Sequence, residues 1–257
     1  MIHFSFENKV AIITGAGIGI GYEIGRQLAL AGGAIVLNDI DLAAAQKAKQ
    51  LILQQGGSCE VVIGDASEQE VINEIIQTAI DNFGQLDFAI ANAGITTFGS
   101  FLEYEYENFQ KLIAVNLQGS FFLAQSAAKQ MVEQKTGGRI IFMSSVTGHQ
   151  AHPNLAAYGM TKAALEMLAK SLGVELAAHK ITVNAIAPGA TLTERTLQLG
   201  SDYQKTWEAI TPSGTVSTPS DIAQTTLFLL SDGASQITGQ SIVVDGGWTS
   251  VSPPPKE

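Results

Sequence analysis

Seven short apolar segments alternate with segments of helical character along almost the whole chain. In order, the apolar segments are KVAIIT, AIVLND, CEVVIGD, LDFAIANAG, RIIFM, ITVNAIAPG and SIVVDGG. The segment after the first of them, YEIGRQLALAGG, has helical periodicity and ends in glycines. Strict alternation of strands and helices predicts a parallel sheet with helices on both faces. The sequence therefore predicts an α/β fold, with a doubly wound parallel sheet of about seven strands.

Residues 1–250 are predicted to form one domain, because no linker, repeat or block of charge interrupts the alternation. The sequence ends in SPPPKE, and we expect residues 251–257 to be a disordered tail. Within the domain, residues 190–218 form a long polar segment, which is a candidate lid over a substrate site. Ser67 and Glu70 have the spacing of a capping box, which predicts a helix that begins at this point.

Composition and charge narrow the classes of function. The 257 residues include 14 Lys and Arg and 24 Asp and Glu, so the net charge is 14 − 24 = −10. This balance disfavours nucleic acid or an anionic membrane as a partner. No run approaches the ~20 apolar residues of a membrane span, and MIHFSFENKV lacks the pattern of a signal peptide, so we expect a soluble cytoplasmic protein. With Cys59 as its one cysteine and no CxxC or Cys/His spacing, the chain is predicted to have no disulfide and no metal site.

The loop after the first predicted strand is rich in glycine. Residues 14–21 read TGAGIGIG, which places glycines at positions 15, 17, 19 and 21. The familiar GxGxxG spacing is not met, because Ile20 and Tyr22 stand where its third glycine would be. The glycines still suit a tight turn that brings helix N-terminal amides to a pyrophosphate. The alternative is a purely structural turn between strand and helix.

An acidic residue ends the second predicted strand. Asp39 comes twenty residues after Gly19, where a dinucleotide-binding fold places an acid to bond the adenosine ribose hydroxyls. The same carboxylate repels a 2′-phosphate, so we predict NAD rather than NADP as the cofactor. The alternative is that Asp39 or Asp41 caps the helix that follows.

The stretch from 138 to 162 carries the candidate chemistry. Lys162 follows Tyr158 by four residues, so on a helix the phenol and the ammonium share a face. A free phenol titrates near pH ~10, and a fixed cation favours the phenolate that general-base catalysis needs. Ser145 follows the predicted strand RIIFM and can hold the oxygen that is deprotonated. The alternative is an amphipathic helix with a snorkelling lysine.

Taken together, these motifs resemble those of the short-chain dehydrogenase/reductase family, whose single domain is of the Rossmann type. The matching positions are Thr14, Gly15, Gly19 and Gly21 in the first loop, Asn92-Ala93-Gly94, Asn116, the set Ser145, Tyr158 and Lys162, and Pro188-Gly189 with Thr193. The resemblance covers the chain except its first few residues and its tail.

The resemblance implies a hydride transfer between NAD(H) and a secondary alcohol or ketone. It gives Tyr158 the role of base, Lys162 a contact with the nicotinamide ribose, Ser145 the substrate oxygen, and Asn116 a water in a proton relay. It implies further cofactor contacts at Gly15, Gly17, Ile18, Gly19, Gly21, Asp39, Asp65, Ala66, Asn92, Ala93, Gly94, Tyr158, Lys162, Pro188, Gly189, Thr191 and Thr193. Asp65 also fits a helix cap, and Asn116 alone would pass for a residue of a helix interior. The places where NADP-dependent members often carry a basic residue hold Ile18 and Ile40, which supports NAD.

The substrate is less constrained than the reaction. The polar segment 190–218 favours a small hydroxylated substrate such as a sugar or polyol, as in members of the glucose dehydrogenase kind. The alternatives are a 3-oxoacyl-carrier-protein reductase, which Asp39 and the acidic charge disfavour, and a non-catalytic dinucleotide-binding regulator. We interpret His149 and His152 as solvated loop residues. The family's PxxR motif is missing, because Pro212 is followed by SGT.

The resemblance also implies an assembly. Two long helices are predicted near 105–132 and 156–178, with small and apolar residues beyond what one sheet face requires. The family pairs such helices between subunits and packs its SIVVDGG strands across a second axis. We therefore expect a homotetramer with dihedral symmetry.

Overall fold

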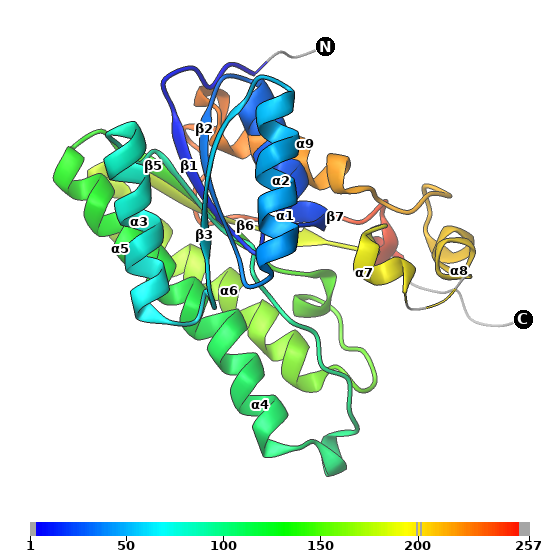
Figure 1. The fold of residues 1–257 in the computed structure, drawn as a ribbon. Coiled ribbons are helices and arrows are strands. Elements are labelled where there is room, and N and C mark those ends of the chain that lie inside the picture. Colours follow the sequence, from blue (N-terminus) through cyan, green and yellow to red (C-terminus); the bar gives the residue numbers. More distant parts are fainter. Residues whose placement is uncertain (1–3, 199, 201, 252–257) are drawn as a thin grey trace, which may run out of the picture.

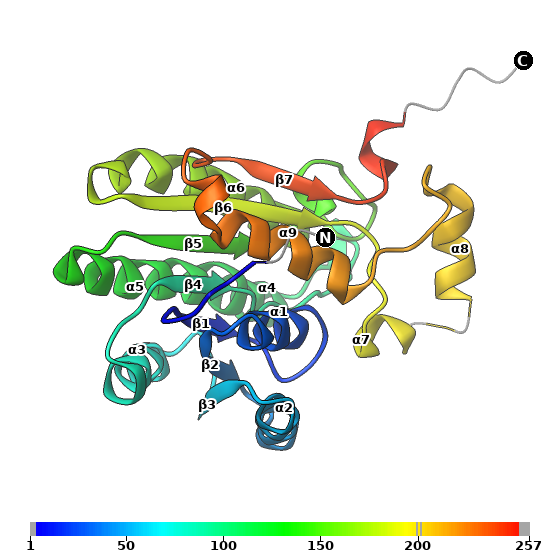
Figure 2. The same cartoon turned by 90° about the horizontal axis from the view of Figure 1, so that it is seen from above.

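Seven parallel strands lie side by side in the order β3-β2-β1-β4-β5-β6-β7 in the computed structural model, which describes residues 4–198, 200 and 202–251 (Figures 1 and 2). The strands are β1 Val10–Thr14, β2 Ala34–Asp39, β3 Ser58–Ile63, β4 Phe88–Ala91, β5 Gly138–Met143, β6 Ile181–Pro188 and β7 Ser241–Val244. The order reverses between β1 and β4, which are direct neighbours. The prediction of a parallel sheet of about seven strands is confirmed, and the expected tail falls almost wholly on residues 252–257, outside the described ones.

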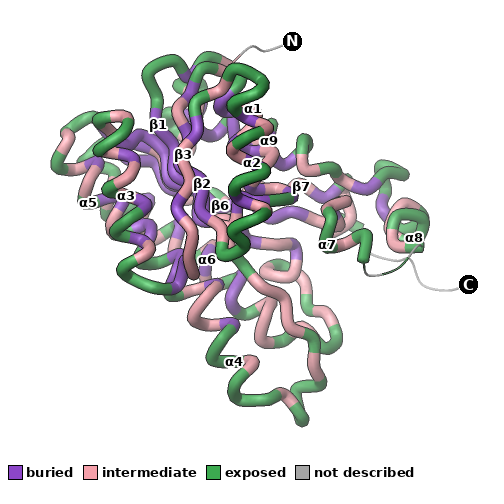
Figure 3. The backbone as a smooth tube through the Cα atoms, in the orientation of Figure 1, coloured by how far each residue is buried: buried purple, intermediate pink, exposed green. Residues whose placement is uncertain are grey.

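Helices cover both faces of the sheet, as predicted. They are α1 Gly19–Leu30, α2 Leu42–Gln54, α3 Gln69–Phe83, α4 Tyr106–Ile113, α5 Ser120–Gln134, α6 Ala156–Glu175, α7 Glu194–Leu197, α8 Tyr203–Ile210 and α9 Pro219–Leu230. Because successive side chains of a strand point to opposite faces, Ile13 packs in the core beneath α1, α2 and α9, and Ile12 in the core beneath α3, α5 and α6. Figure 3 shows these buried strands enclosed by helices whose outer surfaces are exposed.

One predicted long helix is interrupted. The segment expected as a helix near 105–132 forms α4, then a π-helical turn η2 at Ala114–Gly119, then α5. A π turn inserts one extra residue per turn and often occurs at functional sites. Here the turn contains Asn116, which is buried.

The candidate lid, residues 190–218, connects the end of β6 to the start of α9. It carries α7 and α8, which project beyond the carboxyl ends of β6 and β7 (Figure 2). Its two ends are joined, because the amide of Leu192 donates to the carbonyl oxygen of Ser217 at 2.8 Å and that of Ser217 donates to Ala190 at 3.2 Å. The lid is therefore anchored at its base, with α8 at its outer end.

The capping box predicted from Ser67 and Glu70 is not formed. Helix α3 begins at Gln69, with Glu68 at the N-cap position and no side-chain cap. The Ser67 hydroxyl and amide donate instead to Asp65 Oδ1, at 2.8 and 2.9 Å. The carboxylate of Asp65 thus closes the turn after β3, and the N-cap lies one residue later than predicted, at Glu68 instead of Ser67.

None of the helices among the described residues is both long and apolar enough to cross a membrane. Nor do three or more His, Cys, Asp or Glu side chains of the described residues come together as metal ligands would.

Candidate active site

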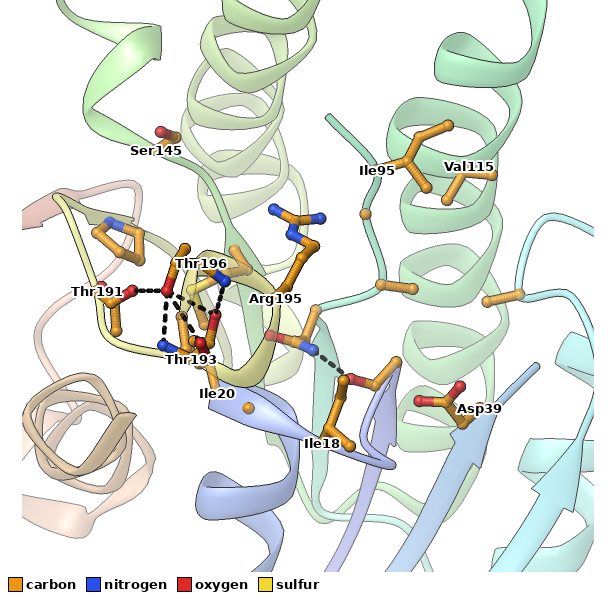
Figure 4. Close-up of a pocket in the computed structure, with 18 of the residues that line it drawn as sticks. Ile18, Ile20, Asp39, Ile95, Val115, Ser145, Thr191, Thr193, Arg195 and Thr196 are labelled. Atoms are coloured by element: carbon orange, nitrogen blue, oxygen red, sulfur yellow. Dashed lines mark hydrogen bonds between the residues drawn. The ribbon is translucent and has the colours of Figure 1, made fainter. Parts of the chain in front are cut away.

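A cavity of about 560 Å³ opens at the carboxyl ends of the strands (Figure 4). Open α/β sheets bind ligands at this edge, at the point where the strand order reverses. The cavity is lined by most of the residues predicted from the sequence, namely Gly15, Ile18, Gly19, Asp39, Asp65, Ala66, Asn92, Ala93, Gly94, Ser145, Tyr158, Lys162, Pro188, Gly189, Thr191 and Thr193. Gly17, Gly21 and Asn116, which were also predicted, lie behind this lining.

The glycine loop joins β1 to α1 by a turn that needs glycine. Gly15 and Gly19 have φ angles of +60° and +62°, which side chains rarely adopt. A Cβ atom at Gly15 would lie 2.8 Å from Ala93 Cα, and one at Gly21 would lie 2.5 Å from the carbonyl oxygen of Gly15. No side chain caps the N-terminus of α1, so its amides are available to an anion in the cavity.

Asn92, which follows the neighbouring strand β4, stabilises this turn. Its side-chain amide donates to the carbonyl oxygens of Thr14 and Gly15 at 3.0 and 2.8 Å. In return, the Thr14 hydroxyl accepts from the backbone amides of Asn92 and Ala93. Asn92 was predicted to contact the cofactor, and its position beside the cavity is as expected, but its side-chain donors are used to join the loops after β1 and β4.

The sequence left open whether Asp39 or Asp41, at the end of β2 and just after it, caps the helix that follows. Asp41 caps α2, because its Oδ1 accepts from the amides of Ala43 and Ala44 at 2.9 and 3.0 Å. Asp39 lines the cavity, and its Oδ2 accepts from the amide of Gly17 at 2.8 Å. The carboxylate of Asp39 is thereby fixed at one end of the cavity, next to the glycine loop.

The Tyr158–Lys162 pair lies on one face of α6, as predicted. The Lys162 Nζ atom lies 5.6 Å from the centroid of the Tyr158 ring and donates to the carbonyl oxygen of Met143 at 2.8 Å. Only 4% of Lys162 is exposed, so the alternative of a snorkelling lysine is wrong. Burial lowers the pKa of Lys162, the phenol of Tyr158 raises it, and the guanidinium of Arg195 lowers it further.

Asn116 is fully buried behind the loop after β4. Its Oδ1 accepts from the amide of Ile95 at 2.9 Å, and its Nδ2 donates to the Ile95 carbonyl and to the Thr161 hydroxyl at 3.0 and 3.1 Å. Its side chain thus holds the loop against α6, one residue before Lys162. Both Nδ2 protons are used by these bonds, whereas Oδ1 accepts one of the two bonds it can accept, so a relay water could bond to this side chain as a donor to Oδ1.

The two histidines near the site are not simply solvated, which corrects the interpretation from the sequence. His149 Nε2 lies 3.0 Å from Glu166 Oε1, and the Ser144 hydroxyl lies 2.7 Å from the same oxygen. His152 stacks on Trp248, with ring centroids 5.1 Å apart. Glu166 follows Lys162 by one helical turn, so it ties the end of β5 to the helix that carries Tyr158 and Lys162.

Comparison with known proteins agrees with this geometry. A family model described as "Enoyl-(Acyl carrier protein) reductase" matches residues 15–249. A short-chain type dehydrogenase/reductase from Mycobacterium marinum has a structure similar to this one, with a TM-score of 0.91, 34% identity and coverage of 96% of this chain and 98% of its own. The chain belongs to the short-chain dehydrogenase/reductase family.

Two further relatives indicate the range of substrates named for members of this family. A 7α-hydroxysteroid dehydrogenase, solved with NADH and 7-oxo glycochenodeoxycholic acid, has a TM-score of 0.90 and 32% identity over 95% of this chain and 96% of its own. An L-rhamnose 1-dehydrogenase (NAD(P)(+)) from a Sphingomonas species is 34% identical over 94% of this chain and 96% of its own. Members of the family bind a nicotinamide dinucleotide, and this chain is an alcohol or ketone oxidoreductase of that general class.

The cavity of this short-chain dehydrogenase/reductase also contains residues that the sequence analysis did not assign to the cofactor or to the chemistry. They are Ile20, Asn38, Ile40, Gly64, Ile95, Lys111, Val115, Met143, Ser144, Glu194, Arg195, Thr196 and Tyr203. Four of them belong to the segment 190–218, which was predicted as a lid and of which only Thr191 and Thr193 had been assigned to the cofactor. Tyr203 reaches the cavity from α8, and burial raises its pKa, whereas the backbone of Thr191 and the charge of Arg195 lower it.

The depressed pKa of Lys162 gives a testable pH dependence of stability. Because the folded pKa is lowered, the unfolded chain binds more protons between the folded value and the ordinary ~10.4, and stability rises with pH across that window. The Lys162→Met variant lacks this pH-dependent contribution to stability, because it has no amino group at position 162. We expect the free energy of unfolding of the variant, minus that of the wild type, to decrease as the pH rises from 7 toward 10. Urea unfolding of the cofactor-free protein at several pH values measures this difference.

The loss of the bond to Met143 costs about 1–3 kcal/mol, but this cost does not vary with pH. Lys170→Met, which removes an exposed lysine from the same helix, should give a nearly constant difference. A constant or growing difference for Lys162→Met would contradict a desolvated ammonium at this position.

Proposed function

We propose that this protein is an NAD(H)-dependent oxidoreductase that interconverts a small hydroxylated secondary alcohol and its ketone. The observation that carries the proposal is the buried Lys162 ammonium beside Tyr158, in a cavity that has Asp39 at its other end. A phenol next to a desolvated cation suits a proton acceptor, and a carboxylate at the end of β2 suits a ribose diol.

Several features of the cavity support NAD as the proposed cofactor. The free amides at the start of α1 would hold its diphosphate, Asp39 its adenosine ribose, and Lys162 with Thr193 its nicotinamide end. When bound, the cofactor supplies the carbon that accepts or donates the hydride. The close packing of Gly15 and Gly21 lets the backbone approach the diphosphate, because a side chain at either position would collide with the loop.

In the proposed reaction, three side chains of the protein act on the alcohol or on its proton acceptor. The Ser145 hydroxyl orients the alcohol oxygen, and the phenolate of Tyr158 takes its proton. Lys162 stabilises the phenolate electrostatically, and its bond to Met143 keeps the ammonium from turning away. Met143 ends β5 and Ser145 follows it, so the groups that hold the lysine and the substrate are two residues apart.

Two observations favour a small hydroxylated substrate. The related L-rhamnose 1-dehydrogenase is named for a sugar, and the lid side of the cavity carries the hydroxyls of Thr191, Thr193 and Thr196. A 3-oxoacyl-carrier-protein reductase is the second candidate, and a net charge of −10 disfavours docking of an acidic carrier. A non-catalytic regulator has no need for a buried lysine beside a tyrosine.

The base is tested by Tyr158→Phe, which keeps the ring and removes the group that accepts the proton. We expect turnover to fall by at least ~10²-fold, the low end for general acid–base catalysis, with NADH affinity nearly unchanged. A panel of sugars, polyols, hydroxysteroids and 3-oxoacyl esters, followed by nicotinamide absorbance, supplies the assay. If Tyr158→Phe retains most of the activity, the proposed mechanism is wrong.

Cofactor choice is tested at Asp39. We expect a higher kcat/KM with NAD(H) than with NADP(H), because the carboxylate repels a 2′-phosphate, and we expect Asp39→Ala to narrow the difference. Asp39→Asn is the matched control for the loop, since it removes the charge but keeps an acceptor for the Gly17 amide. A wild-type preference for NADP(H) would refute this part of the proposal.

Assembly is tested in solution. Large apolar side chains are exposed on α5 and α6, including Phe121, Met167 and Val174, and on the β7 side at Phe228 and Val243. Exposed apolar surface on two separate sides supports the expected homotetramer with dihedral symmetry. Light scattering at micromolar concentration should give the mass of four chains, and a monomer would contradict the expectation.

A further inference from the structure

Arg195 is a cation of the cavity that the proposed mechanism does not use. It lies on α7, which Thr193 caps, and it lines the cavity together with Ser145, Tyr158 and Lys162. Its guanidinium donates to the Thr96 hydroxyl at 3.2 Å. Among residues 4–198, 200 and 202–251, no carboxylate lies within 4.0 Å of the guanidinium. It is therefore an exposed cation with one neutral partner.

The guanidinium points away from the parts of the cavity assigned to the adenosine and the diphosphate. In Figure 4, Arg195 extends toward the space between Ser145 and Ile95, whereas Ile18, Ile20 and Asp39 lie on the opposite side of it. The neighbouring Glu194 is directed the other way, because its Oε2 lies 3.7 Å from the position of a Cβ atom on Gly19. The two charges of α7 thus face different parts of the cavity.

The end of the cavity that Arg195 faces is positively charged. Lys162 lies there as a buried ammonium, and the charge of Arg195 contributes to its lowered pKa. The other groups near this end are the hydroxyls of Thr96, Ser145 and Thr196 and the apolar side chains of Ile95 and Val115. Lys111, four residues before Val115, is a further cation of the lining. The acidic groups of the lining, Asp39, Asp65 and Glu194, belong to the cofactor end. Neither Lys162 nor Arg195 has a carboxylate of the described residues within 4.0 Å, and two such cations favour an anionic ligand.

We propose that Arg195 binds a carboxylate of the substrate, so that the enzyme acts on a short hydroxy acid and its oxo acid. This inference rests on the proposed oxidoreductase function and specifies the substrate class of the same site. A guanidinium and a carboxylate form two parallel hydrogen bonds, which orient the acid as well as attract it. Oxidation removes a hydride from the carbinol carbon and a proton from the hydroxyl, and it leaves the carboxylate unchanged.

The kinetic test compares an acid with its neutral counterpart. We expect the wild type to have a kcat/KM for 3-hydroxybutanoate at least about 10-fold above that for 3-hydroxybutanamide, the range of hydrogen bonds to charged groups. Arg195→Met should reduce this ratio to near one. Arg195→Lys should leave an intermediate ratio, because an ammonium keeps the charge but cannot form the two parallel hydrogen bonds of a guanidinium. Lys205→Met, which removes an exposed lysine from the same lid, should leave the ratio unchanged.

A binding test separates the role of Arg195 from catalysis. Isobutyrate and isobutyramide have no hydroxyl to oxidise, and calorimetry gives their affinity for the protein mixed with NADH. We expect isobutyrate to bind more tightly to the wild type and to lose this advantage in Arg195→Met. NADH affinity, measured by fluorescence, should change little in that variant.

Equal binding of isobutyrate and isobutyramide by the wild type would overturn the inference, and so would a preference for the acid that survives in Arg195→Met. It would also be overturned if Arg195→Met lost only its affinity for NADH, because Arg195 would then be assigned to the diphosphate. Failure of the proposed function looks different, since neither acids nor neutral alcohols would then be oxidised by the wild type with either nicotinamide cofactor. In that case the calorimetry still decides whether Arg195 binds a carboxylate.

Discussion

The buried ammonium of Lys162 is the constraint on which the arrangement of the site depends. Withdrawal of a charge from water is costly unless the group finds partners, and Lys162 finds the carbonyl oxygen of Met143 and the ring of Tyr158. The first partner ends β5 and the second lies one turn earlier on α6, so the helix must pack tightly against the end of the strand. Glu166 reinforces this contact one turn later, through Ser144 and His149. A single packed junction therefore positions the lysine, the phenol and Ser145, the residue proposed to orient the substrate oxygen.

The second junction of the site lies where the strand order reverses, between β1 and β4. There the turn at Gly15 approaches Ala93 so closely that no side chain fits between them. Asn92 uses its amide to satisfy two carbonyl groups of that turn, and buried polar groups are costly when left unpaired. The glycines and the asparagine are thus one structural unit, which leaves the amides of α1 free for a ligand. Asn116 plays a comparable part for the loop that continues from β4.

Sequence reasoning predicted the fold, the cavity and the Tyr158–Lys162 pair because each depends on a short-range pattern. Alternation gives the sheet, a spacing of four gives the shared helix face, and a glycine cluster gives the turn. It could not tell whether Asp39 or Asp41 capped α2, since two acids in three residues fit both roles. It missed the π turn around Asn116, because one extra residue in a helix leaves no clear mark on the apolar pattern. The partners of His149 and His152 come from distant segments, and no local pattern shows them.

Charge is distributed unevenly along the cavity, although the chain as a whole is acidic. Acidic groups gather where β2 and β3 end, and the cations Lys162 and Arg195 lie at the end of the cavity that is proposed to hold the substrate. The two cations differ in what holds them, since Lys162 is fixed by the packed junction of β5 and α6, whereas Arg195 stands on the short helix of the lid. Its contact with Thr96 joins the lid to the loop after β4, across the mouth of the cavity. An anion bound by Arg195 would therefore also be held between these two segments, so that recognition of the substrate and the position of the lid depend on the same side chain.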